Sequence, residues 1–456
     1  MKNSPIIAVD TFLRGISCEN WVKNMGTFKN DAKFALTGKG LLVRIITGLT
    51  NSLVYSEAFK NAARKRPADF TRDRKMTFEE VVLFMLTSAK CSTQCSLRRF
   101  FAALGKEAMM KQQSFSEARA KINVSAFVQL FQLTVGAMTE NLQETWEGYL
   151  VYAIDGSKIA LPADKGLLAH FGPAGRGGTS PTAQASILYD VPNDIVVDAL
   201  IGPMSVDERT MASRHVENCK NFAQGAGKLF IFDRGYPSFE LVEELEGGGF
   251  SYVMRVRSKF SVEIDAQAAP DGYAWLEQGG KRIKLRVVKF DLDSGMQETL
   301  ITNLTDKNLD VAAFKKLYFM RWPVETKYDV VKNKLQLENF TSRTVEGVEQ
   351  DFYAAMYLTN VAAAAASDAQ AEIDEAREGK NNKYRYKANL NEAIGVLKDR
   401  LILALAEDSP RKQAKLIQKI IDEVTRSVTP IRGDRSVPRS SSSRKCKFHH
   451  NRKANC

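Results

Sequence analysis

The stretch YLVYAIDGS, residues 149–157, decides the fold, because its run of aromatic and β-branched side chains ends in an acid, a glycine and a serine. Such a run predicts a buried β-strand. The stretch KLFIFDRGYPS, residues 228–238, has the same plan. We therefore expect two buried strands, each ending in an acid before a turn, with Asp155 and Asp233 at one edge of a sheet.

Strand and helix patterns alternate around these two stretches. Residues 183–202 predict two strands around the turn VPND, and residues 206–222 predict a helix. Further strand patterns follow at residues 250–264, 281–292 and 297–304, and helical patterns return after them. This order predicts a mixed, α+β protein.

Residues 1–145 have the pattern of an all-helical region. The segments TFEE at residues 77–80 and SFSE at residues 114–117 match a capping box, and each predicts the start of a helix. Arg119 and Lys121 follow a turn-like approach to a helix, which would suit a helix that docks on DNA. A solvated helix face is the alternative, and the sequence alone favours it.

The segment LYFMRWPVETKYDVVKNKL, residues 317–335, is patterned as an amphipathic helix. In a regular helix, four of its polar side chains would share one stripe, at about 0°, 300°, 340° and 320°: Tyr318, Arg321, Glu325 and Lys332. Such a stripe is a poor core face, because buried charges must be paired. It is a suitable face for holding a phosphate beside a metal.

Pro323 interrupts this segment, because a proline inside a helix removes a backbone hydrogen bond but is tolerated in the first turn. Either the helix begins near Trp322, or it kinks there. In the first case the single stripe holds only for Glu325 and Lys332.

Asp155, Asp233 and Glu325 together have the chemistry of a two-metal phosphoryl-transfer site. Carboxylate oxygens are hard ligands for Mg²⁺, and two such ions bind the attacking and leaving oxygens of an in-line displacement. A single acid at a strand end is more simply a turn or cap residue. The prediction therefore rests on the three acids together with the basic stripe beside the third.

The charge distribution indicates a polyanionic partner. The net charge is +12, from 65 Lys and Arg against 53 Asp and Glu. Residues 426–456 carry nine of these bases and one acid, which supplies +8 of the total. We expect a flexible basic arm that neutralises DNA phosphates. The Cys and His residues of this tail do not match a standard zinc spacing, so zinc is the less favoured alternative: they are Cys446, His449, His450 and Cys456.

Membrane and secreted classes are disfavoured. No apolar stretch reaches the roughly 18 residues of a membrane span, and the first residues lack the pattern of a signal peptide. The six cysteines are scattered, unlike a disulfide framework. We expect reduced thiols in a cytoplasmic, nucleoid-associated protein.

The motifs AIDGS, LYDVPND and FDRGYPS, with the pattern Y-x2-R-x3-E-x6-K from Tyr318 to Lys332, resemble the DDE transposases of bacterial insertion sequences, specifically the IS4 family. The similarity runs from about residue 77 to about residue 360. It implies an RNase H-like catalytic core with a β-strand insertion between the second Asp and the Glu, flanked by helical N-terminal and C-terminal regions. The implied divisions are a DNA-end-binding domain at 1–145, a core at 146–245 and 311–370, a β-rich insertion at 246–310, a helical region at 371–430 and a basic tail at 431–456.

The resemblance also implies roles for single residues. Asp155, Asp233 and Glu325 would bind Mg²⁺, with Mn²⁺ able to substitute. The residues implied at the DNA are Tyr318, Arg321 and Lys332 at a phosphate, Arg234 at the backbone, and Trp275 stacked on a flipped-out base. For Trp275 a place in the core is the alternative.

The implied activity is cut-and-paste transposition, with strand cleavage, a hairpin intermediate and strand transfer. The expected partners are double-stranded DNA, as terminal inverted repeats and target, and a second copy of the chain in a synaptic dimer; no membrane is involved. Two alternatives stay open: a DNA-binding protein whose core no longer cuts, and a structure-specific nuclease with the same fold.

Overall fold

The computed structural model describes residues 39–72, 74–87, 92–107, 110–175, 177–220, 226–292 and 295–431. The chain divides into two compact units. Unit 1 contains residues 1–141 and 331–456, and unit 2 contains residues 142–330. The expected basic tail, with its Cys and His residues, lies outside the described residues from position 432 onward.

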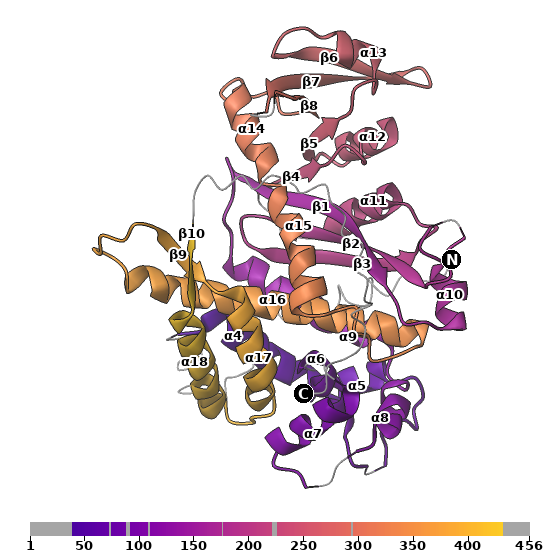
Figure 1. Cartoon of the computed structure of the whole chain (residues 1–456), viewed down its shortest axis with the longest axis vertical. Helices are drawn as coiled ribbons and strands as arrows, with labels where there is room; N and C mark the ends of the chain where they lie inside the picture. Colours follow the sequence, from indigo (N-terminus) through magenta and orange to yellow (C-terminus); the bar gives the residue numbers. More distant parts are fainter. Residues whose placement is uncertain are drawn as a thin grey trace. The chain divides into compact units, whose positions relative to one another are not determined.

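Unit 2 is built on one eight-stranded sheet with the strand order β3-β2-β1-β4-β5-β8-β7-β6 (Figure 1). The strands are β1 (Tyr149–Ala160), β2 (Thr182–Asp190), β3 (Ile195–Pro203), β4 (Gly227–Phe232), β5 (Ser251–Val256), β6 (Asp271–Gln278), β7 (Lys281–Asp291) and β8 (Gln297–Thr302).

The sheet is mixed. Strands β1, β4 and β5 are parallel to one another, and β2 and β3 add an antiparallel pair at one side of β1. On the other side β8, β7 and β6 continue the same sheet in antiparallel fashion. The expected insertion, residues 246–310, therefore contains β5 as well as these three strands. The predicted mixed α/β fold is confirmed, and a mixed sheet flanked by helices is consistent with an RNase H-like core.

Helices cover both faces of this sheet: α10 (Lys165–Phe171), α11 (Glu208–Cys219), α12 (Phe239–Gly247), α13 (Val262–Ala266), α14 (Val311–Phe319) and α15 (Trp322–Asp329). Successive strand residues point to opposite faces. Val151, Leu229 and Ile231 form one core cluster with Phe314 and Leu317 of α14. Residues of the same parity in β1 and β4 therefore face α14.

Unit 1 is mostly helical, as expected for residues 1–145 in the part described. Its elements are α4 (Leu41–Val54), α5 (Glu57–Ala63), α6 (Phe78–Thr87), α7 (Thr93–Ala103), α8 (Gln112–Arg119), α9 (Val124–Asn141), α16 (Val345–Glu375), β9 (Arg385–Ala388), α17 (Leu390–Leu405), α18 (Pro410–Arg426) and β10 (Val428–Ile431). The long, alanine-rich α16 is largely buried, and small side chains let α9 pack closely along it.

One of the two predicted capping boxes is confirmed. The Thr77 hydroxyl accepts from the Glu80 amide at 3.3 Å, and the Glu80 carboxylate accepts from the Thr77 amide at 3.1 Å. The second prediction is wrong, because α8 begins at Gln112 and residues 114–117 lie inside it. The Gln94 side chain accepts from the Gln112 amide at 2.9 Å, so a contact with a neighbouring helix satisfies the first turn.

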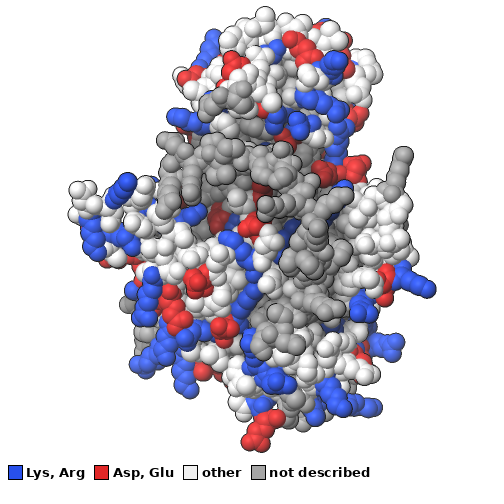
Figure 2. All heavy atoms as spheres, viewed as in Figure 1, with Lys and Arg blue, Asp and Glu red and all other residues white. Residues whose placement is uncertain are grey.

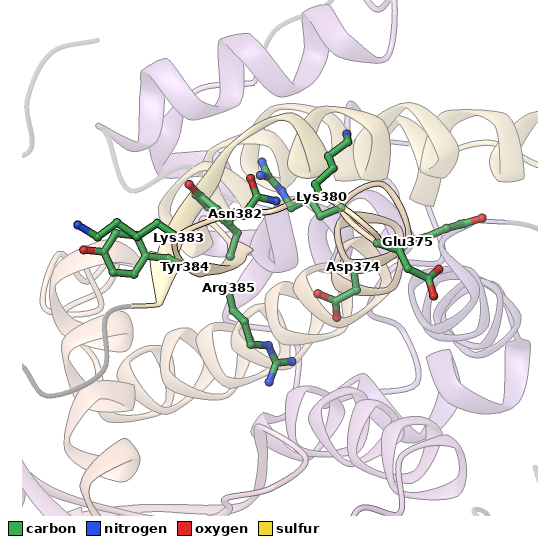
Figure 3. A pocket seen from close by; sticks show the side chains of 10 residues that line it. Asp374, Glu375, Lys380, Asn382, Lys383, Tyr384 and Arg385 are labelled. Atoms are coloured by element: carbon green, nitrogen blue, oxygen red, sulfur yellow. The ribbon is translucent and has the colours of Figure 1, made fainter.

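One pocket of the described chain contains none of the predicted site residues. This pocket, of about 620 Å³, lies where α16 leads into β9, lined mainly by charged residues, with Lys383 and Tyr384 side by side (Figure 3). On the face drawn in Figure 2, Lys and Arg lie interspersed with Asp and Glu.

The described helices include none that is long and apolar enough to cross a membrane. Among the described cysteines, Cys95 and Cys219 are both free.

Candidate active site

Asp155 and Asp233 face the same side of the sheet. Asp155 shares the parity of Val151 in β1, and Asp233 continues the parity of Leu229 beyond the end of β4. The parallel register pairs Ala153 with Ile231, so two residues further along Asp155 comes level with Asp233. Neighbouring strands are about 4.8 Å apart, so the two backbones run close together here.

Asp155 does not end its strand, contrary to the sequence-based prediction. Strand β1 continues to Ala160, because antiparallel pairing with β2 extends to the pair Ala160 and Thr182. The pairing with β4 stops earlier, at Ala153. Asp155 therefore lies where β1 outruns β4, while Asp233 directly follows the end of β4 as predicted.

The segment from residue 317 is not one helix. Helix α14 ends at Phe319, and α15 begins at Trp322 with Pro323 in its first turn, which is the first of the two expected alternatives. Tyr318 therefore belongs to α14, Arg321 is the N-cap of α15, and the single stripe does not include them. A π-helical turn, η1 (Val330–Lys334), follows directly, so the regular helix that would align Lys332 with Glu325 is absent as well.

Asp233 is surrounded by cations and donors. The Tyr318 hydroxyl donates to its Oδ1 at 3.1 Å, and Arg255 Nη1 lies 3.6 Å from the same oxygen. Burial acts to raise the pKa of Asp233, but the Arg234 backbone amide, Arg321, the Tyr318 hydroxyl and Arg255 outweigh it, so the pKa is lowered. Asp233 is therefore held as a carboxylate.

The pKa of Asp155 is shifted in the opposite direction. Burial raises its pKa to about 6; Arg321 and the Gly156 amide oppose this shift, while the carboxylates of Glu325 and Glu208 add to it. A carboxyl group that is half-buried among other carboxylates gains from any cation placed beside it. Asp155 and Asp233 thus form a pair of neighbouring acids whose pKa values are shifted apart.

The acids suit a hard divalent cation by the chemistry of their oxygen donors. They are not gathered into a finished ligand set: among the described residues, no group of three or more His, Cys, Asp or Glu side chains is arranged to hold a metal ion. Glu325 instead accepts from Arg321 Nη2 at 2.8 Å.

Arg321 retains donor capacity although only 5% of it is exposed. Within the described part of the chain, no acceptor reaches its Nε. A buried guanidinium donor without an acceptor costs free energy unless a ligand supplies one. An anion such as a phosphate oxygen would supply it.

The remaining residues expected at DNA come from several elements. Arg234 is exposed, as is Lys121, and Trp275 is 38% exposed on β6 with the Arg282 guanidinium 4.7 Å from its ring, so it is not a core residue. Lys332 is half-buried in η1, where burial lowers its pKa although Glu338 opposes the shift.

Arg119 is buried inside unit 1. Its Nε donates to Gln350 at 3.0 Å, and its Nη2 donates to Asp351 at 3.0 Å and to the Gly347 carbonyl at 2.8 Å. Thr341 accepts another of its bonds. A direct contact between Arg119 and DNA would require this network to open.

Three residues at the site were missed by the sequence analysis. Arg255 shares the parity of Val253 in β5, which places it on the face of Asp233, but nothing in the sequence distinguishes it from other strand residues. Glu208, at the start of α11, packs so closely on Gly156 that a Cβ there would lie 2.8 Å from its Oε1. Tyr328 follows Glu325 by one helical turn, and its hydroxyl donates to the Asp155 carbonyl at 2.9 Å.

One family model matches the part of the chain that contains these residues. Residues 146–361 match the model of the transposase DDE domain. The match includes Asp155, Asp233 and the segment that carries Arg321 and Glu325. No curated protein matches the chain. Residues 146–361 are therefore similar to the transposase DDE domain, a domain of phosphoryl-transfer enzymes.

Proposed function

We propose that the chain is the cut-and-paste transposase of an insertion sequence of the IS4 type. The observation that carries this proposal is the meeting of Asp155 and Asp233 with Tyr318 and Arg321 on one face of the sheet. Asp155, Asp233 and Glu325 would hold Mg²⁺, or Mn²⁺ in its place, which supplies charge stabilisation at the attacked phosphate.

The protein side chains would do the binding and orienting. Arg321 would offer its unsatisfied Nε to a phosphate oxygen beside the acids, and Tyr318 would keep Asp233 in place. Lys332 would bind a neighbouring phosphate, Arg234 would contact the backbone, and Trp275 would stack on a base at the element end.

DNA affinity would come largely from Lys and Arg residues outside the acidic site. The basic tail, residues 432–456, lies outside the described residues, and its role follows from composition alone. Deleting residues 436–456 should reduce affinity for duplex DNA and lower the slope of log K against log salt by about 0.9 for each phosphate that the tail neutralises. An unchanged slope in filter-binding titrations would rule out binding of the tail to DNA.

Strand cleavage of the element ends tests the function itself. Paired inverted repeats in the DNA that flanks the gene, bracketed by a short direct duplication, would provide the substrate. With Mg²⁺ we expect cleavage, a hairpin end, and joining of the 3′ end to a target duplex by a synaptic dimer. Cleavage without joining would instead identify a structure-specific nuclease, and binding without cleavage would identify an inactive DNA-binding protein.

A further inference from the structure

The main-chain carbonyl of Asp155 receives two side-chain hydroxyl groups from separate elements of unit 2. Tyr328 Oη of α15 donates to it at 2.9 Å, and Ser186 Oγ of β2 donates to it at 3.3 Å. Tyr328 is 7% exposed and Ser186 is fully buried. A carbonyl oxygen has two lone pairs, and at Asp155 two side-chain hydroxyl groups from separate elements lie within hydrogen-bond distance of it.

The two hydroxyl groups reach this carbonyl from different elements of unit 2. Ser186 pairs with Gly156 in the β1–β2 register, so its side chain lies on the face opposite to the Asp155 carboxylate. Tyr328 comes from α15, which also carries Glu325, one turn earlier. The Tyr328 bond therefore ties the helix of one acid to the strand of another.

Ser186 is itself held by a buried pair. His215 Nε2 lies 3.0 Å from Ser186 Oγ, and His215 Nδ1 lies 2.8 Å from Asp198 Oδ2. Asn218 Nδ2 donates to the same Asp198 oxygen at 2.8 Å. The Ser186 hydroxyl has one hydrogen, so it donates to the Asp155 carbonyl in the state in which His215 Nε2 donates to Ser186 Oγ. Because Asp198 accepts from Nδ1, both ring nitrogens of His215 carry hydrogen in that state.

This chain of bonds has the composition of a Ser-His-Asp triad, but its place in the fold excludes nucleophilic catalysis. Ser186 and His215 are completely buried, so no substrate reaches the Ser186 oxygen in this structure. A fully bonded buried network rigidifies its surroundings. Here the surroundings are the backbone at Asp155.

We propose that Tyr328 and Ser186 are positioning residues that hold Asp155 through its main-chain carbonyl and so preset the carboxylate for a divalent cation. The inference rests on the proposed function, because it takes Asp155 as a metal ligand. Partners that orient a ligand typically change metal affinity about 10- to 100-fold when they are removed. Neither hydroxyl touches the cation or the DNA in this scheme, so the effect should appear in metal affinity.

The test is a Mn²⁺ titration of the full chain without DNA, followed by electron paramagnetic resonance. Asp155→Asn identifies the Mn²⁺ that depends on Asp155. Tyr328→Phe and Ser186→Ala should each raise the Mn²⁺ dissociation constant of that site about tenfold. In strand cleavage they should raise the Mg²⁺ concentration for half-maximal rate by a similar factor, while saturating Mg²⁺ restores most of the rate.

Two matched variants control for the loss of a buried hydroxyl group elsewhere in unit 2. The Tyr252 hydroxyl donates to Glu246 at 3.0 Å, and the Thr302 hydroxyl donates to the Tyr252 carbonyl at 2.6 Å. Tyr252→Phe and Thr302→Val should leave Mn²⁺ affinity unchanged, and thermal unfolding establishes that all four variants fold.

The possible outcomes separate the two proposals. If Asp155→Asn removes a Mn²⁺ signal but Tyr328→Phe and Ser186→Ala bind Mn²⁺ like wild type, the positioning role is wrong and the metal assignment stands. If no Mn²⁺ signal depends on Asp155, the metal assignment fails, and the positioning role fails with it.

Discussion

Arg119 in unit 1 and Arg321 in unit 2 are almost equally buried, at 3% and 5% exposure, but their hydrogen bonding differs. Arg119 donates to Gln350 and Asp351 and has further acceptors around its guanidinium. Arg321 bonds to Glu325, and among the described residues no acceptor reaches its Nε. Two arginines of similar burial therefore differ in how many of their donors the protein itself satisfies.

The largest effect should come from the acids that surround Arg321. Asp233→Asn should lower strand cleavage by about 10³-fold, because an amide is a poor substitute for a carboxylate at a cation and the cation contributes several kcal/mol. Single-turnover cleavage with Mg²⁺ measures it, and the exposed Asp291→Asn in β7 is the control. Wild-type rates in Asp233→Asn would remove this residue from the site.

Arg119→Met tests the structural side of the comparison. Removing one partner of a buried ion pair leaves Asp351 uncompensated, and the free energy of unfolding should fall by about 3–5 kcal/mol. Urea unfolding measures this decrease. The exposed neighbour Lys121→Met should change it by less than about 0.5 kcal/mol. Equal stability of the two variants would contradict the structural role of the Arg119 network.

Arg321→Lys tests the functional side. The lysine keeps the charge but loses the planar set of donors, so cleavage should fall by about 10²-fold with little change in unfolding. Arg119→Lys should show the reverse, with a large loss of stability and a small effect on cleavage per folded molecule. If both variants lose mainly stability, the proposed difference between a functional Arg321 and a structural Arg119 is wrong.

A smaller effect is expected from Tyr318→Phe, which removes the hydroxyl bond to Asp233. One hydrogen bond contributes about 1 kcal/mol, so cleavage should fall by about fivefold. Tyr252→Phe is the matched control, because its hydroxyl donates to Glu246 and not to an acid of the site. Equal rates in the two variants would show that the Tyr318 hydroxyl does not support Asp233.

The smallest effect concerns stability and pH. The pKa of Asp155 is about 6 in the folded chain, above its ordinary value of 3.8. The folded state therefore binds more protons between these values, so stability falls as pH rises through this window. Without metal, Asp155→Asn should be more stable than wild type by about 1 kcal/mol at pH 8, a value reduced for solvent screening, and should show no gain at pH 4. Thermal unfolding at both pH values measures it, and equal stability at pH 8 would contradict a raised pKa.

The position of each acid after a buried apolar run could be predicted from local pattern, because the run that precedes it is formed by neighbouring residues. Asp155 and Asp233 each follow such a run, and the structure places both on one face of the sheet. The capping box that starts α6 could also be predicted from local sequence, because the Thr77 and Glu80 side chains each accept from the other's backbone amide.

Long-range contacts limited the rest of the prediction. The start of α8 was misplaced because Gln94 caps it from another helix. Arg119 had the same local surroundings as a solvated helix residue, and only Asp351 and Gln350, more than 200 residues later in the chain, show that it is buried. Local pattern carries no information about partners so distant in sequence.

The sequence by itself determined the acids, the arginine that follows Tyr318 by three residues, and the alternation of side chains along each strand. Tertiary structure decided how far β1 runs past β4, where the helix breaks before Trp322, and which hydroxyl groups reach the Asp155 carbonyl. The physical reason is that side-chain direction follows from the local backbone period, whereas strand length and partner choice depend on the pairing and packing of segments far apart in the chain.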